Sequence, residues 1–350
     1  MSEKKRIREW LRVPGNYEPG ALNAITDVPG VKTGHFTIHD DAIHTGITLI
    51  QAHDLDAYQY PAPCAVYVGN GFGKLTGSVQ VEELGVVESM IALTNTLSVP
   101  MVAHGLIEYY LENNKDITSI SVLVGETNDS FLSEIGKLAI KPAHVKEAIK
   151  DLSVEPREGA IGAGAGTSCY GYKGGIGTSS RRVEMQFPGG EETYTIGALV
   201  QTNFSGNLNV YGHPVRKGKS MMQSGGSCMI IVATDAPLDC RQLKRIAKRG
   251  IAGMTQTGSY LANSSGDFCV AFSNFPGNIT PRGNKNLKTL TILSDELISP
   301  LFEATCEAVR EAIYNSLTMA DLITGRGGRC LEVIDMPAVV KGLSGDLAVI

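Results

Sequence analysis

The chain has 350 residues, of which 43% are hydrophobic and 19% charged, with 40 glycines and a formal net charge of −5. A chain of this length can bury a large core, and its glycine content indicates a globular protein rich in turns. The acidic balance argues against a nucleic-acid surface, and no uncharged apolar run reaches the roughly 18 residues of a membrane span, so we expect neither nucleic acid nor membrane as a partner.

Apolar runs rich in β-branched residues recur between turn residues, and each predicts a strand. The predicted strands are 35–39, 47–52, 64–68, 119–124, 193–201, 229–233 and 269–272. Apolar spacings of three and four residues predict helices at 79–93, 101–111, 141–152, 238–254 and 297–316. Asp235 and Pro237 are interpreted as the start of the fourth helix. Because strands and helices do not alternate strictly, we expect layered sheets with helices outside them, in one intertwined domain over residues 1–350.

The seven cysteines are scattered and include no C-x-x-C pair, which is typical of reduced thiols rather than of disulfides or a zinc site. The basic start at residues 1–6 is not followed by an apolar h-region, so we expect no secretory signal. The two observations together predict a cytoplasmic protein.

The segment around Ser227 carries the most informative chemistry. Gly225 and Gly226 precede this serine, which opens an apolar run that leads to Leu238. Glycine lets the backbone adopt conformations that other residues resist, so the Ser227 hydroxyl can attack the Gly226 carbonyl and break the chain there. The cut would leave Ser227 with a free α-amine whose pKa of about 8 suits it to act as a base at neutral pH.

Four further segments place polar residues at predicted strand ends or in tight turns, where binding sites are commonly built. They are residues 124–129, 199–204, 263–268 and the glycine-rich loop 69–77. Each segment alone also fits a turn or a helix cap. Their order along one chain therefore carries more information than any one of them.

In this order the segments resemble the DmpA-type aminopeptidases, the family of self-processing L-aminopeptidase/D-esterases and β-peptidyl aminopeptidases. The resemblance runs through nearly the whole chain, and its most specific stretches are 169–178, 233–238 and 265–267. It implies an α+β fold, a four-layer αββα sandwich of the N-terminal-nucleophile type that the ornithine acetyltransferases share in related form. It also implies that no metal or organic cofactor is required.

The same resemblance implies self-cleavage between Gly226 and Ser227. The products would be an α chain of residues 1–226 and a β chain of residues 227–350 that stay together. Members of the family often form tetramers, so we expect a homo-oligomer of such αβ units.

Residue roles carried over from the family follow the matching motifs. Ser227 would become the N-terminal nucleophile, and Asn203 would donate an amide N–H to the developing oxyanion. Ser265 and Asp267 match a hydroxyl–carboxylate pair that orients the nucleophile and its amine. Glu126 matches the carboxylate that binds the free ammonium group of the substrate.

We therefore predict a serine aminopeptidase that removes N-terminal residues from short peptides, amides or esters with a free amine, through an acyl-enzyme. Three alternatives remain open at this point. An acetyltransferase of the ornithine acetyltransferase type would use a threonine in a different motif. A second alternative makes Cys228 the nucleophile, and a third is a binding protein that kept the fold without catalysis.

Overall fold

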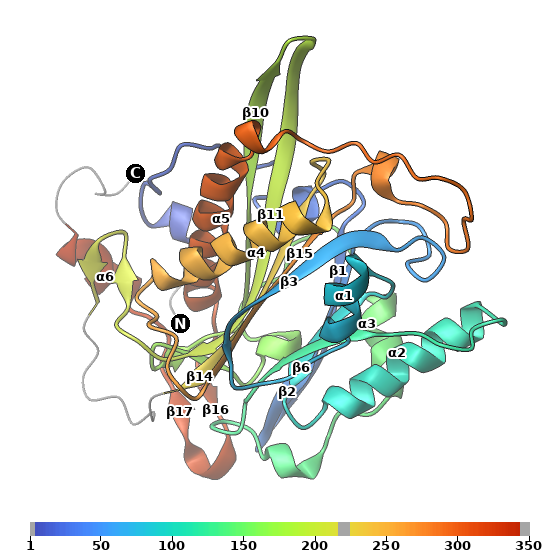
Figure 1. The fold of residues 1–350 in the computed structure, drawn as a ribbon. Helices are drawn as coiled ribbons and strands as arrows, with labels where there is room; N and C mark the ends of the chain where they lie inside the picture. Colours follow the sequence, from blue (N-terminus) through green and yellow to red (C-terminus); the bar gives the residue numbers. More distant parts are fainter. Residues whose placement is uncertain (1–3, 216–224, 344–350) are drawn as a thin grey trace.

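The computed structural model describes residues 4–215 and 225–343, which are built around two β-sheets (Figure 1). The six-stranded sheet has the order β10 (Ile176–Phe187), β11 (Gly190–Phe204), β14 (Gly226–Thr234), β15 (Ser265–Ser273), β3 (Ala62–Gly71) and β5 (Val86–Val87). The five-stranded sheet has the order β1 (Lys32–Asp40), β2 (Ile43–Gln51), β6 (Ile91–Asn95), β7 (Leu123–Thr127) and β4 (Leu75–Thr76). The pairs β14–β15 and β6–β7 are parallel, whereas β11–β14 and β1–β2 are antiparallel, so both sheets are mixed.

Helices cover the outer face of each sheet. The six-stranded sheet packs against α4 (Cys240–Thr255) and α5 (Ser299–Thr318), and the five-stranded sheet packs against α2 (Val99–Asn113) and α3 (Ala143–Lys150). Within the described ranges, the remaining α-helices are the short α1 (Ser78–Leu84) and α6 (Met336–Gly342). Three small hairpins lie in the same ranges: β8–β9 (Ser168–Cys169, Tyr172–Lys173), β12–β13 (Asn209–Val210, His213–Pro214) and β16–β17 (Ile323–Thr324, Cys330–Leu331). The order helix, sheet, sheet, helix confirms the predicted αββα sandwich.

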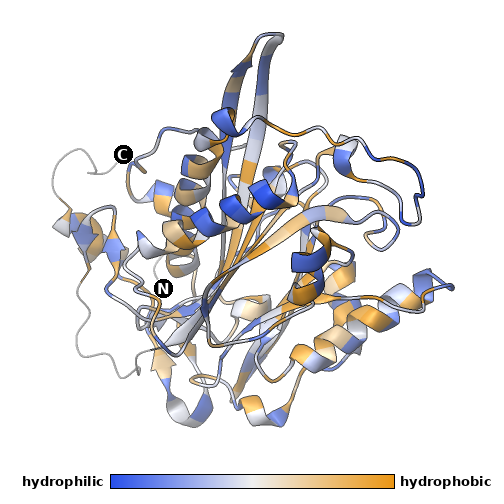
Figure 2. Cartoon of the chain, viewed as in Figure 1, coloured by the Kyte–Doolittle hydropathy of each residue, from blue (hydrophilic) through white to orange (hydrophobic). Residues whose placement is uncertain are grey.

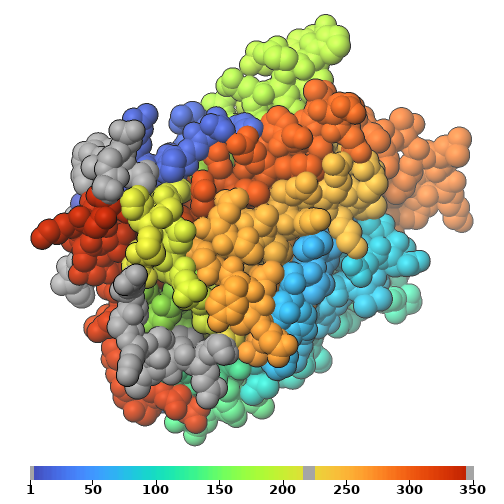
Figure 3. All heavy atoms as spheres, turned by 60° about the vertical axis from the view of Figure 1, so that its left-hand side comes forward, coloured from blue at the N-terminus to red at the C-terminus, as the bar shows by residue number. Residues whose placement is uncertain are grey.

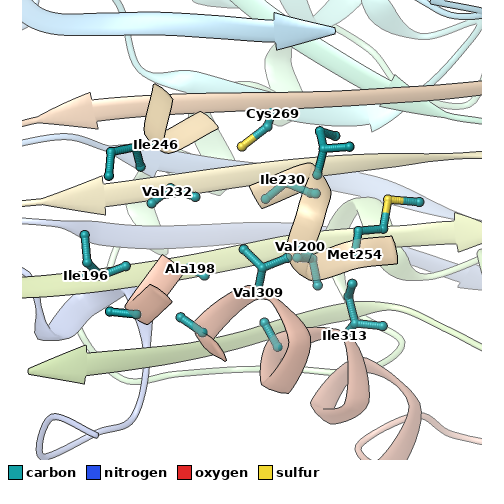
Figure 4. Packing of buried hydrophobic residues seen from close by; sticks show 14 of the residues in the cluster. Ile196, Ala198, Val200, Ile230, Val232, Ile246, Met254, Cys269, Val309 and Ile313 are labelled. Carbon is teal, nitrogen blue, oxygen red and sulfur yellow. The ribbon is translucent and has the colours of Figure 1, made fainter. Parts of the chain in front are cut away.

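Side chains of the six-stranded sheet alternate between two separate cores. Met229, Ile231 and Phe268 lie in the core between the sheets. The alternate strand residues face the helices, for example Ile196, Val200, Ile230 and Val232 (Figure 4). There they pack in one cluster, the helix-side core, with Ile246 and Met254 of α4 and Val309 and Ile313 of α5. The central strands are therefore hydrophobic on both faces, whereas α4 presents a largely hydrophilic outer surface (Figure 2). This outer surface of α4 is exposed, and the tip of the β10–β11 hairpin projects beyond it (Figure 3).

The helix predicted at 79–93 is wrong in its second half. The helix ends at Leu84 because Gly85 adopts a left-handed conformation with φ of +67°, and its N–H caps the carbonyl of Val81. The chain then forms β5 and β6, so the apolar residues that suggested one long helix belong to two sheets. The strand predicted at 119–124 is displaced toward the C-terminus and forms β7.

The predicted start of the fourth helix, which is α4, is also wrong. Asp239, rather than Asp235, caps α4, because its side chain accepts a 2.7 Å hydrogen bond from the backbone N–H of Gln242. The carboxylate of Asp235 instead accepts from the N–H of Thr195, which ties the end of β14 to β11. The helix that follows, Cys240–Thr255, covers all but the first two residues of the range 238–254 that the apolar spacing predicts.

Candidate active site

Strand register brings the predicted nucleophile and two neighbours to one end of the six-stranded sheet. β14 lies between β11, which is antiparallel to it, and β15, which is parallel. Ser227 is opposite Asn203 on β11 and Gly266 on β15. Segments separated by dozens of residues in sequence therefore meet at the start of β14.

The Ser227 hydroxyl is held against the peptide bond before it. It donates a 2.6 Å hydrogen bond to the carbonyl oxygen of Gly226 and accepts a 3.3 Å hydrogen bond from the N–H of Gly266. Gly226 has φ of +133°, a conformation that side-chain-bearing residues rarely adopt. A Cβ atom there would stand 2.2 Å from the carbonyl oxygen of Asn203, so the sharp bend needs glycine.

Two hydrogen bonds fix the side chain of Asn203. Its Oδ1 accepts from the N–H of Ser168 at 3.0 Å, and its Nδ2 donates to the carbonyl oxygen of Asn128 at 2.9 Å. A primary amide nitrogen carries two hydrogens, so one donor remains after the bond to Asn128. The amide is oriented before any substrate arrives, which is what a site for developing negative charge requires.

Ser265 and Asp267 lie beside Ser227 but on the other face of the sheet. The Ser265 hydroxyl donates to Oδ1 of Asp267 at 2.9 Å, and both side chains are buried. Because side chains alternate along β15, the two share the face of Cys269, which belongs to the helix-side core, whereas Phe268 faces the second sheet. Burial raises the pKa of Asp267 to about 6, against the opposing effect of hydrogen bonds from Ser265 and the backbone of Cys228.

Cys228 follows the same alternation. Its side chain is fully buried in the helix-side core, and burial raises the pKa of its thiol well above the ordinary value. A thiol that stays protonated and points away from Ser227 is unsuited to be the nucleophile.

Glu126 approaches the site from the five-stranded sheet. It is the fourth of the five residues of β7, and only 3% of it is exposed. Burial raises the pKa of its carboxyl, and the nearby Lys74 acts in the opposite direction. The backbone N–H of Lys74 donates to Oε1 of Glu126 at 3.0 Å, and the Lys74 Nζ lies 3.7 Å from the same oxygen.

A cavity of about 550 Å³ joins these groups. Four of the six predicted site residues line it, namely Glu126, Asn203, Gly226 and Ser227, whereas Ser265 and Asp267 lie behind its wall. The other lining residues are Gly71, Phe72, Gly73, Lys74, Thr96, Asn128, Ser130, Phe131, Ser168, Gly225 and Ser264. The cavity is thus polar around Ser227, and the aromatic residues Phe72 and Phe131 also line it.

Three contacts of the site were missed from the sequence. Ser168 holds the amide of Asn203, Gly266 donates to the serine hydroxyl, and Lys74 contacts Glu126. Lys74 and Gly266 lie in the segments 69–77 and 263–268, which the sequence marks by their glycine and polar residues. No local pattern, however, shows that a backbone N–H or a cross-strand partner faces a particular side chain. That information lies in the register of distant strands.

Within the described residues, no group of three or more histidine, cysteine, aspartate or glutamate side chains is arranged to hold a metal ion. None of the helices in those same ranges combines the length and hydrophobicity needed to cross a membrane.

The sequence model of peptidase family S58 matches residues 23–331. A β-peptidyl aminopeptidase, BapA of Sphingosinicella microcystinivorans, is 34% identical over 97% of this chain and 93% of its own. The chain belongs to peptidase family S58.

Two solved structures show the same fold. The PH0078 protein from Pyrococcus horikoshii OT3 is 40% identical, with a TM-score of 0.90 over 96% of this chain and 98% of its own. The L-aminopeptidase D-Ala-esterase/amidase from Ochrobactrum anthropi, described as a prototype for the serine aminopeptidases and a variant of the Ntn-hydrolase fold, is 31% identical, with a TM-score of 0.89 over 97% and 98% of the two chains. The protein is accordingly a serine aminopeptidase of the Ntn type.

Proposed function

We propose that the chain cuts itself between Gly226 and Ser227, and that Ser227 then removes N-terminal residues from short peptides, amides or esters. One observation carries the proposal. The Ser227 hydroxyl lies 2.6 Å from the Gly226 carbonyl oxygen, in the wall of a cavity that also contains Asn203 and Glu126.

In the self-cleavage step, Oγ of Ser227 bonds to the carbonyl carbon of Gly226. The bond from that carbon to the Ser227 nitrogen breaks, and the hydroxyl proton passes to the nitrogen. The product is an ester, which water hydrolyses to a carboxylate on Gly226 and a free hydroxyl on Ser227. The new α-amine can then act as the base of the mature enzyme, since its ordinary pKa is about 8.

In turnover, this amine takes the hydroxyl proton while Oγ attacks the substrate carbonyl. The remaining N–H of Asn203 stabilises the oxyanion, the leaving amine departs with the proton, and water releases the acyl group from Ser227. Ser265 and Asp267 hold the amine from the helix side of the sheet. Glu126 binds the free ammonium group of the substrate, which makes an unblocked N-terminus a requirement.

The six-stranded sheet supports an enzyme whose two fragments remain one folded unit. β14 begins at the proposed cut and lies between β11 of the first fragment and β15 of the second, so the sheet holds both fragments together.

The proposed substrate class agrees with the names of the relatives, which are a β-peptidyl aminopeptidase and an aminopeptidase with esterase and amidase activity. Assembly into a homo-oligomer stays a prediction from the family.

Denaturing gel electrophoresis with mass spectrometry tests the proposal. Purified protein should yield fragments of residues 1–226 and 227–350, and Ser227→Ala should stay intact and inactive on amino-acid p-nitroanilides. Cys228→Ala is the matched control, and it should cut itself and retain activity because its side chain faces the helix-side core. An active enzyme with an unbroken chain, or an active Ser227→Ala, would refute the proposal.

A further inference from the structure

The cavity holds a pair of opposite charges rather than a single negative one. Among the described residues that line it, Lys74 and Glu126 are the two charged side chains. A pocket that recognises only an ammonium group needs one carboxylate and no nearby cation. Here the carboxylate proposed to bind the substrate already has a lysine beside it.

Sheet register makes this pairing a built feature of the fold. β4 pairs with β7 so that Leu75 is opposite Gly125 and Thr76 opposite Val124, which places Lys74 across from Glu126. The preceding Gly73 allows the close approach, because a Cβ atom there would lie 3.2 Å from Oε1 of Glu126.

The two charges differ in their exposure to solvent. The side chain of Lys74 is 55% exposed and that of Glu126 only 4%. The Lys74 ammonium also donates to Oγ1 of Thr96 at 2.7 Å, which holds it at the cavity. Because an ion pair with a solvated partner is weak, a substrate can displace Lys74 from Glu126 at small cost.

A lone substrate ammonium would place two cations next to one carboxylate, and the two cations would repel each other. A substrate that brings a carboxylate close to its ammonium removes this conflict. Its ammonium pairs with Glu126 and its carboxylate with Lys74, so each charge in the cavity gains an opposite partner.

We propose that Lys74 is a specificity-determining residue that selects N-terminal aspartyl residues, whose carboxylate lies on the ammonium-bearing carbon or one carbon away. The first case is a β-linked aspartyl residue and the second an α-linked one. The inference rests on the proposed function, since Glu126 must bind the ammonium.

Two matched substrate pairs test it on the mature enzyme. For the α-linked case, kcat/KM of aspartyl α-p-nitroanilide is divided by that of asparaginyl p-nitroanilide. For the β-linked case, aspartyl β-p-nitroanilide is compared with 3-aminobutanoyl p-nitroanilide, which has a methyl group in place of the carboxylate. Both members of each pair use Glu126, so a change in the ionisation of Glu126 cancels in the ratio.

We expect at least one ratio to exceed one in the wild type and to fall about tenfold in Lys74→Met, the effect of losing one charge-assisted hydrogen bond. The ratio that falls identifies the linkage. Lys74→Arg should retain the preference. Lys137→Met is the matched control, because Lys137 lies 3.7 Å from Glu134 in an exposed ion pair away from the cavity, and both ratios should stay at the wild-type value.

Ratios of one or less in the wild type, or ratios that Lys74→Met leaves unchanged, would overturn the inference. Such results leave the proposed function standing, provided that the enzyme is cut and hydrolyses the neutral substrates. A chain that stays whole while active refutes the proposed function instead, and the gel shows this before any ratio is measured.

Discussion

Gly226→Ala is the sharpest test of the geometry at the proposed cut. The new Cβ atom would stand 2.2 Å from the carbonyl oxygen of Asn203 and 2.5 Å from Cα of Phe204. Ordinary contact begins at 3.4 Å, so the start of β14 must move by about 1.2 Å away from β11. The positive φ of +133° adds strain of roughly 1–3 kcal/mol.

A displacement of about 1 Å between reacting groups can slow a reaction by ~100-fold, and we expect self-cleavage to slow by about that factor. The assay follows loss of the full-length chain on denaturing gels after synthesis of the precursor. Gly190→Ala is the matched control, since Gly190 has φ of +141° and, beyond its two chain neighbours, no atom of the described residues lies within 4 Å of the position that its new methyl group would take. It bears similar strain without a clash, so it should lose stability but cut at the wild-type rate. Wild-type cutting by Gly226→Ala would refute the reasoning.

Two further predictions concern carboxylates. Glu126→Gln should raise KM for substrates with a free amine by about 10- to 100-fold with a smaller effect on kcat, because one charge-assisted bond is lost; an unchanged KM in steady-state kinetics would contradict this. In the uncut Ser227→Ala background, Asp267→Asn should stabilise the fold above pH 6, because ionising a buried carboxyl whose pKa is raised from 3.8 to about 6 costs about 3 kcal/mol. Urea unfolding should show that the gain in stability is absent below about pH 4 and grows through pH 6. A gain in stability that does not vary with pH would contradict ionisation of Asp267 as its cause.

The sequence predicts the parts of the site that depend on local pattern. The β-branched run after Ser227 predicts β14, and the glycine before it predicts the strained bend, because both follow from properties of single residues and their neighbours. The sequence does not predict the contact between Lys74 and Glu126, since it depends on how β4 pairs with β7 across almost 50 residues of chain. The misplaced helix at 79–93 has a similar cause, because tertiary pairing of β5 and β6 overrides an apolar spacing that also fits a helix.

Strand alternation also decides how Ser265 and Asp267 can act. The hydroxyl of Ser227 lies on the cavity face of the sheet, with Glu126, whereas the Ser265–Asp267 pair lies on the helix face. Side chains on opposite faces of one sheet do not touch, but the main chain belongs to both faces. The backbone N–H of Cys228 donates a hydrogen bond to the carboxyl of Asp267. This N–H is one residue away from the nitrogen of Ser227, which self-cleavage would free. We therefore expect the pair to act on the amine of Ser227 and not on its hydroxyl, because the main-chain nitrogen of β14 can be reached from either face of the sheet.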